Sequence, residues 1–181
     1  MGLVLNVLLG VSQNCLGGRQ IPPVLNALWK AQVTGRSFIR DPAYGAIELL
    51  AERPEEALDR FLFGKDAAAW ERLLLEIDVF GQQEDDSLLG LWRHHEGLRL
   101  EDAPVVLLAE HESPRTVAPS IADYIVWRGH AAAGDEAVSL ARIWFDRNGL
   151  EQQLSPEEIA QAAASLPNPE ERLERYFLEN D

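Results

Sequence analysis

The chain has 181 residues and a mass of 20.2 kDa, which suits one domain with a sizeable core. Its 46% hydrophobic and 25% charged residues exclude a disordered or collagen-like polypeptide. Asp and Glu number 30 against 16 Lys and Arg, so the formal net charge is −14. Because such a surface repels phosphate backbones and anionic lipids, we expect no direct binding to nucleic acid or to membranes.

The charge is distributed unevenly along the chain. Residues 1–40 contain basic side chains and no carboxylate, whereas residues 41–181 hold 12 basic and 30 acidic side chains. An acidic surface of this kind attracts a basic protein partner, although a large net charge also serves simply to keep a protein soluble.

The single cysteine, Cys15, allows no internal disulfide and excludes a zinc site of the multi-cysteine kind, so we expect a reducing, cytoplasmic location. The apolar run at residues 2–11 is preceded by no Lys or Arg and is interrupted by Asn6, which is unlike a signal peptide. The run is also shorter than the roughly 20 residues that span a bilayer. We interpret it as a buried strand.

Helix signals precede three stretches in the first half of the chain. Pro22-Pro23 begins a helix that ends before Gly35, Pro54 begins one that ends at Gly64, and Asp66 is placed to cap a third. In the third stretch the apolar residues follow the i, i+3, i+4, i+7 spacing of an amphipathic helix: Trp70, Leu73, Leu74 and Ile77.

The spacing of the apolar residues changes from helical to strand-like after Gly81. Short apolar runs at residues 88–92 and 105–108, bounded by polar residues or proline, predict strands. Ser120 and Asp123 then have the spacing of a capping box, which predicts a following helix. Together these patterns predict an α+β fold with a small, mainly antiparallel sheet flanked by helices.

The tail predicts three further helices. Asp135 begins the first, which ends at Asn148-Gly149; Ser155 caps the second and Asn168 the third. The inner face of the first is predicted to carry Ala137, Leu140, Ala141 and Trp144. We expect one domain, residues 1–181, with a core at about 20–130 and a helical cap at about 131–181.

Catalytic motifs are not found in the sequence. The run His94-His95-Glu96 could suggest a metal-binding site. Adjacent histidines on a strand point to opposite faces, however, and no HExxH pattern occurs. There is also no GxSxG, GxGxxG or GxxxxGK[ST] motif. We therefore predict no catalytic residue, cofactor or metal. A small metal-dependent hydrolase that uses a histidine remains the alternative, with His94, His95, His111 and His130 as candidates.

The order of elements between residues 79 and 127 resembles the SUKH superfamily. The segments that carry the resemblance are Phe80-Gly81, Ser87-Leu-Leu-Gly-Leu-Trp92, Pro104-Val-Val-Leu-Leu-Ala-Glu-His-Glu112 and Arg115-Thr-Val-Ala-Pro-Ser120-Ile-Ala-Asp-Tyr-Ile125. In that family a strand with an aromatic residue leads to a Pro-Val-Val strand, a tight turn, a Val-Ala strand end and a Ser-capped helix. The acidic loop Glu84-Asp85-Asp86 and the long helical tail depart from the family pattern.

The resemblance implies a non-enzymatic immunity protein that binds and neutralises a cognate bacterial toxin, often a nuclease. The charge agrees independently, because an acidic protein can occupy a basic nuclease site as a phosphate mimic. An intracellular scaffold or regulatory module that meets no toxin is a further alternative.

The candidate partner-binding residues are carboxylates in the loops that bound the two predicted strands. They are Glu84, Asp85, Asp86, Glu101, Asp102, Glu110 and Glu112. Trp92 would be their apolar anchor if it is exposed, although its flanking leucines favour a place in the core.

Overall fold

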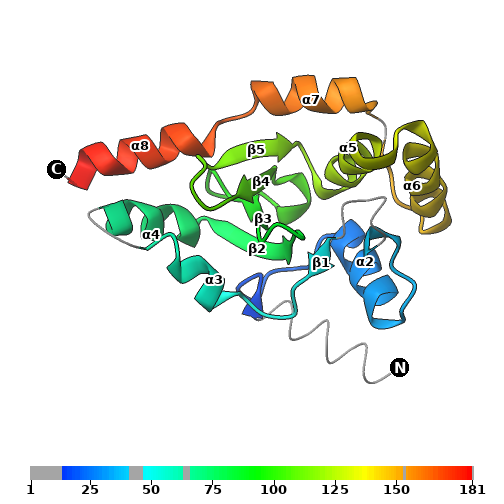
Figure 1. Ribbon diagram of the computed structural model, residues 1–181, viewed down its shortest axis with the longest axis horizontal. Helices are drawn as coiled ribbons and strands as arrows, with labels where there is room; N and C mark the ends of the chain where they lie inside the picture. Colours follow the sequence, from blue (N-terminus) through cyan, green and yellow to red (C-terminus); the bar gives the residue numbers. More distant parts are fainter. Residues whose placement is uncertain (1–13, 41–46, 63–65, 153, 181) are drawn as a thin grey trace.

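The computed structural model describes residues 14–40, 47–62, 66–152 and 154–180. It confirms the predicted α+β fold, with an antiparallel sheet of five strands in the order β1-β2-β3-β4-β5 and helices on either side (Figure 1). The strand predicted at residues 2–11 lies outside the described residues.

The strands form a meander, each pairing antiparallel with the next along the chain. They are β1 (Glu48–Leu49), β2 (Ile77–Gln82), β3 (Leu88–Trp92), β4 (Val105–Leu108) and β5 (Arg115–Ala118). Because the chain reverses at every step, the β2–β3 and β4–β5 turns lie at one end of the sheet. The β3–β4 connection lies at the other end. The register places Leu88 opposite Leu108, so the first two turns are neighbours.

One face of the sheet is covered by helices from both ends of the sequence. Side chains alternate across a strand, and Phe80, Leu89, Leu91 and Val105 share the core of this face. The covering helices are α2 (Pro23–Val33), α5 (Ile121–Ala133) and α6 (Asp135–Arg147), and Ile159 of α7 (Pro156–Ser165) joins the same core.

The opposite face of the sheet has its own core. Val79, Leu88, Trp92 and Val106 point into it. They meet α3 (Glu55–Asp59), α4 (Ala67–Leu75) and α8 (Pro169–Asn180), which Figure 1 shows on the other side of the sheet from α2 and α6. The chain also forms two short 3-10 helices within the described residues, η1 (Phe38–Arg40) and η4 (Leu100–Asp102). Burial on both faces explains why the central strands β3 and β4 are continuously apolar rather than alternating.

The predicted helix starts are confirmed where a side chain caps the helix. Ser120 Oγ accepts a hydrogen bond from the backbone N–H of Asp123, and Ser155 and Glu158 form a complete capping box. Asp66, in contrast, makes no side-chain capping bond to α4.

Three predicted placements are wrong. The helix that begins after Pro54 ends at Asp59 instead of continuing to Gly64, because the chain turns at Arg60 and Phe61. Ile77 does not extend the α4 helix but begins β2, because the helix ends at Glu76 without a glycine or proline to mark it. Leu140 is 54% exposed instead of facing inward, while Ala137, Ala141 and Phe145 are buried.

The three tail helices cover different parts of the molecule. Helix α6 packs against α5, α7 lies beside β5, and α8 packs antiparallel against α4 on the other face of the sheet. The tail thus contributes to both cores through Phe145, Leu173 and Tyr176.

Candidate functional site

The two neighbouring turns bring four of the predicted carboxylates around one hollow of about 260 Å³. Asp85 and Asp86 come from the β2–β3 turn, and Glu110 and Glu112 come from the β4–β5 turn. Two cations, Arg60 and Arg115, also line it, so its formal charge is −2. We call this site, with those six side chains, the acidic hollow.

The backbone of both turns is unusual in the same way. Asp86 has φ 64° and His111 has φ 66°, and among the described residues these are the only non-glycine positions in the left-handed region. The turns are closed by hydrogen bonds from Asp86 N to Gln83 O at 3.1 Å and from Glu112 N to Ala109 O at 3.3 Å. The fold therefore holds the carboxylates on fixed, tightly turned segments.

The carboxylates of the β2–β3 turn are oriented by local hydrogen bonds. Asp85 accepts the backbone N–H of Ser87 at 3.0 Å, and Asp86 accepts the Gln82 side-chain amide at 2.9 Å. Burial alone raises the pKa of Asp85, but the hydrogen bonds from Ser87 outweigh it and hold that pKa below its ordinary value. Asp85 is accordingly ionised at neutral pH. Arg60 donates a hydrogen bond to the backbone carbonyl of Asp86 and not to the Asp86 carboxylate.

The carboxylates of the β4–β5 turn are also exposed to solvent. Glu112 pairs with Arg115 at 3.2 Å, and Glu110 Oε1 lies 3.5 Å from His111 Nε2. Glu110 and Glu112 side chains are each 55% exposed. Glu84 is exposed in the β2–β3 turn beside the acidic hollow without lining it.

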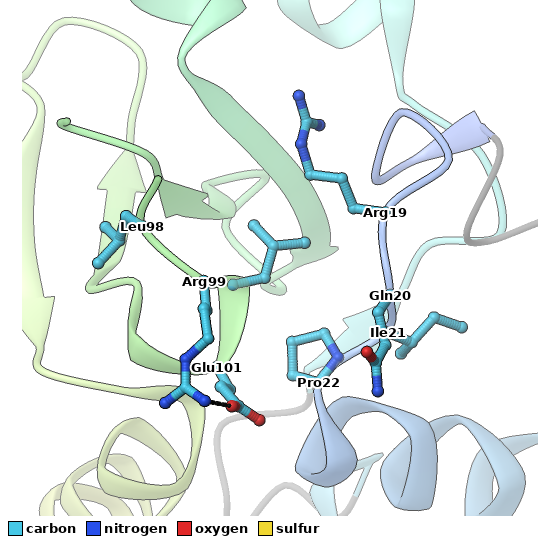
Figure 2. A pocket seen from close by; sticks show the side chains of 8 residues that line it. Arg19, Gln20, Ile21, Pro22, Leu98, Arg99 and Glu101 are labelled. Atoms are coloured by element: carbon cyan, nitrogen blue, oxygen red, sulfur yellow. Dashed lines mark ion pairs between the residues drawn. The ribbon is translucent and has the colours of Figure 1, made fainter. Parts of the chain in front are cut away.

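The other two predicted carboxylates are separated from this group. Glu101 and Asp102 lie in η4, within the β3–β4 connection at the opposite end of the sheet, because alternate connections of a meander fall at opposite ends. Both pair with Arg99, each at 2.7 Å. Figure 2 shows Glu101 beside a second pocket, of about 320 Å³, where the chain at Arg19 and Pro22 forms the facing wall. The sequence grouped all seven carboxylates, whereas the structure brings together five.

The predicted apolar anchor must be corrected. Trp92 is 1% exposed in the core beneath α8, and its indole N–H donates to Glu76 at 3.1 Å. A tryptophan that is buried and hydrogen-bonded within the chain offers no surface to a partner.

The four histidines are dispersed over the fold. His94 and His95 follow β3, with ring centroids 4.7 Å apart, whereas His111 lies in the β4–β5 turn and His130 on α5. Across the part of the chain that the structure describes, no three or more His, Cys, Asp and Glu side chains are arranged to hold a metal ion.

The cations of the acidic hollow were not identified from the sequence. Arg115 follows Glu112 by three residues, a spacing that could have indicated their pairing. Arg60 carries no such local signal, since it reaches the β2–β3 turn only through the packing of α3 beside the sheet.

Comparison with protein-family models, with curated proteins and with solved structures finds no match. The described helices include none that is both long and apolar enough to cross a lipid bilayer.

Proposed function

We propose that the chain is an immunity protein of the SUKH type, which binds a basic toxin domain through the acidic hollow and thereby neutralises it. The observation that carries the proposal is the convergence of Asp85, Asp86, Glu110 and Glu112 from two turns around one concave surface. Loops held by a rigid sheet are a common place for a binding surface.

The chemistry of the hollow favours Arg and Lys side chains as its ligands. Carboxylates accept bidentate hydrogen bonds from guanidinium groups, and a concave acidic surface excludes phosphate while admitting cations. Nuclease active sites are commonly basic, so an acidic protein can occupy one in place of the nucleic acid. A nuclease or another nucleic-acid-targeting domain is therefore the proposed partner.

The two internal cations do not oppose such binding strongly. Arg60 donates to the backbone carbonyl of Asp86. The pair between Glu112 and Arg115 is solvent-exposed, and exposed pairs contribute only about 0–1 kcal/mol. A partner arginine can therefore replace Arg115 at little cost. The backbone geometry of the two turns also reduces the ordering that binding would require.

The proposed location is the cytoplasm, where an immunity protein would meet its toxin before secretion. The free thiol of Cys15, buried and donating to Leu50 O at 3.4 Å, is compatible with a reducing compartment.

The test is co-expression with the product of the gene immediately upstream of the gene for this chain. We expect the two proteins to co-purify and the wild-type chain to restore growth of cells that express the toxin. A variant with Asp85→Asn, Asp86→Asn, Glu110→Gln and Glu112→Gln should lose both effects, since amides keep the shape and remove the charge. The control, Glu101→Gln with Asp102→Asn, neutralises carboxylates at the opposite end of the sheet and should retain both.

Thermal melts of both variants establish that they fold. Failure of the wild-type chain to bind the co-expressed protein would reject the immunity function. Equal binding by the wild-type chain and the hollow variant would reject this surface.

A further inference from the structure

A third concave surface, apart from the acidic hollow and the pocket beside Glu101, lies between α2 and α6. It has a volume of about 560 Å³ and is lined by residues from both helices and from the loop that follows each. Figure 1 shows these two helices at the same end of the molecule, α2 in blue and α6 in olive. This volume lies within the range of ligand pockets, large enough for several side chains.

Five of the ten residues that line this α2–α6 groove are apolar, and they leave it open to close approach. Pro23, Ala27 and Ala31 line it at spacings of four residues along α2, and such small side chains allow another backbone to come near. The facing wall is Trp144, whose ring is held against Phe38 with centroids 5.1 Å apart. One turn before Trp144 on α6, Leu140 presents its exposed side chain at the same side of the helix.

The groove is basic in an otherwise acidic protein. Lys30 and Arg36 line it, and no carboxylate does. In the described ranges neither cation forms an ion pair, whereas Arg93, Arg99 and Arg172 are all paired. Asp146 and Glu151, which are close in sequence to the lining residues Asn148 and Leu150, do not line the groove.

One polar atom of the groove also has no hydrogen-bond partner. Asn26 lines the groove, and its Oδ1 is shielded from solvent without an acceptor bond from any described residue. Asn26 therefore adds to the groove wall a side-chain amide whose oxygen the described residues leave unpaired.

We propose that the α2–α6 groove binds an acidic amphipathic helix of a partner protein. An apolar helix face packs on the Ala27, Ala31 and Trp144 walls, as in other helix-in-groove complexes. Glutamates or aspartates beside that face pair with Lys30 and Arg36. The net charge of −14 does not prevent this, because the Debye length of about 8 Å at physiological ionic strength limits repulsion from distant carboxylates.

This proposal is independent of the immunity function, because the acidic hollow selects a basic partner and the groove an acidic one. The probe is a fluorescein-labelled synthetic peptide with leucine at i, i+3, i+4 and i+7 and glutamate at its exposed positions. A second peptide has lysine in place of every glutamate. Fluorescence anisotropy at physiological ionic strength measures the affinity of each peptide for the full chain.

We expect the glutamate peptide to bind the wild-type chain and the lysine peptide to bind at least tenfold more weakly. The double variant Lys30→Glu with Arg36→Glu should bind the glutamate peptide at least tenfold more weakly than the wild-type chain. Arg142→Glu with Arg175→Glu makes the same charge change at exposed positions outside the groove and should retain the affinity. Equal affinity in both double variants, or no binding by the wild-type chain, would overturn the proposal.

A second variant tests the shape without changing the charge. Ala31→Trp fills the groove and should also weaken the glutamate peptide at least tenfold, while the indole N–H resonance of Trp144 should shift on binding to the wild-type chain. Sedimentation of the chain without peptide tests whether a second copy of the chain occupies the groove instead. A wild-type dimer that Lys30→Glu with Arg36→Glu dissociates would assign the groove to a second copy and overturn the partner helix.

Discussion

Arg172 on α8 donates to the carboxylate of Glu76, 96 residues earlier in the chain, at 3.0 Å. Glu76 ends α4, and its carboxylate also accepts the indole N–H of Trp92 on β3 and the hydroxyl of Tyr176 on α8. One partly buried carboxylate thus joins two helices and a strand that lie far apart in sequence. The last helix of the chain is fixed to the sheet at this point.

Removing this carboxylate should destabilise the fold. Glu76→Ala leaves an indole N–H, a hydroxyl and a guanidinium without their acceptor, so we expect the free energy of unfolding to fall by about 2–4 kcal/mol. Urea denaturation measures it. Glu179→Ala is the control, because it removes only the exposed pair with Arg72 and should cost less than about 1 kcal/mol. Equal losses in the two variants would contradict this role of Glu76.

Glu76 should also make stability depend on pH. Burial raises the pKa of this carboxyl, but the hydrogen bonds from Tyr176, Arg172 and Trp92 outweigh it, so the folded pKa lies below the ordinary 4.5. Its stabilising contribution is therefore complete above pH 4.5 and is lost as the pH falls through the lower, folded pKa.

Thermal melts from neutral pH to about pH 3 test this linkage. The Tm of the wild-type chain should fall more steeply below pH 4.5 than that of Glu76→Gln, which has no carboxyl to protonate at this position. Other carboxyl groups titrate equally in both proteins, so the difference between the curves isolates Glu76. Parallel curves would show that Glu76 is not the responsible group.

Cys15 should be unreactive in the native chain. The thiol is 2% exposed, and burial, followed by the nearby charge of Glu52, raises its pKa from 9.0 to about 11. Because the thiolate is the nucleophile, iodoacetamide should leave the native chain unmodified at neutral pH and alkylate it fully in urea, as mass spectrometry would show. Stability should fall as the pH rises from 9.0 to about 11, since only the unfolded thiol ionises there. Rapid alkylation of the native chain would contradict this burial.

Gly90 on β3 should not tolerate a side chain. A Cβ at this position would lie 2.2 Å from Cγ2 of Ile77, a fully buried side chain on the neighbouring strand β2. We expect Gly90→Ala to cost about 2–3 kcal/mol in urea denaturation. Gly81→Ala, whose Cβ would meet its nearest atom at 3.3 Å, should cost less.

The double variant Gly90→Ala with Ile77→Ala tests the cause of that loss. If the Ile77 methyl group is responsible, the double variant should be more stable than the sum of the two single losses implies. Strict additivity would assign the cost to the backbone of β3 instead.

Local signals in the sequence predicted the capped helices and failed where long-range packing decides. Ser120 and Ser155 cap α5 and α7 within three residues of each helix start, so the sequence contains the complete signal. Ile77 continues the helical spacing of Leu73 and Leu74, yet it pairs with Trp92 in the sheet. The side of α6 that carries Leu140 is exposed because α6 packs against α5 through other residues, and a local helical pattern does not specify which side meets α5.

The candidate site was predictable only in part for the same reason. Acidic residues beside predicted strands indicated loops, and five of them do cluster at one end of the sheet. Their convergence requires the meander order, which no local pattern specifies. That order also separates Glu101 and Asp102 from the rest, and the packing of α3 beside the sheet brings Arg60 to Asp86.

Binding kinetics should distinguish Glu84 from Glu110, two glutamates at the end of the sheet where the β2–β3 and β4–β5 turns lie. Glu84 lies beside the acidic hollow, whereas Glu110 lines it, so the two differ in place but not in charge or length. Glu84→Gln should only slow association with the proposed toxin partner and reduce the salt dependence of association, because exposed charges mainly steer encounter. Glu110→Gln should in addition speed dissociation, at a cost of about 2–5 kcal/mol if a toxin arginine buries this carboxylate. Surface plasmon resonance at several salt concentrations measures both rate constants, with Glu101→Gln as the control from the opposite end. Unchanged association rates at low salt for both glutamate variants would refute the acidic-hollow mechanism and leave the α+β fold untouched.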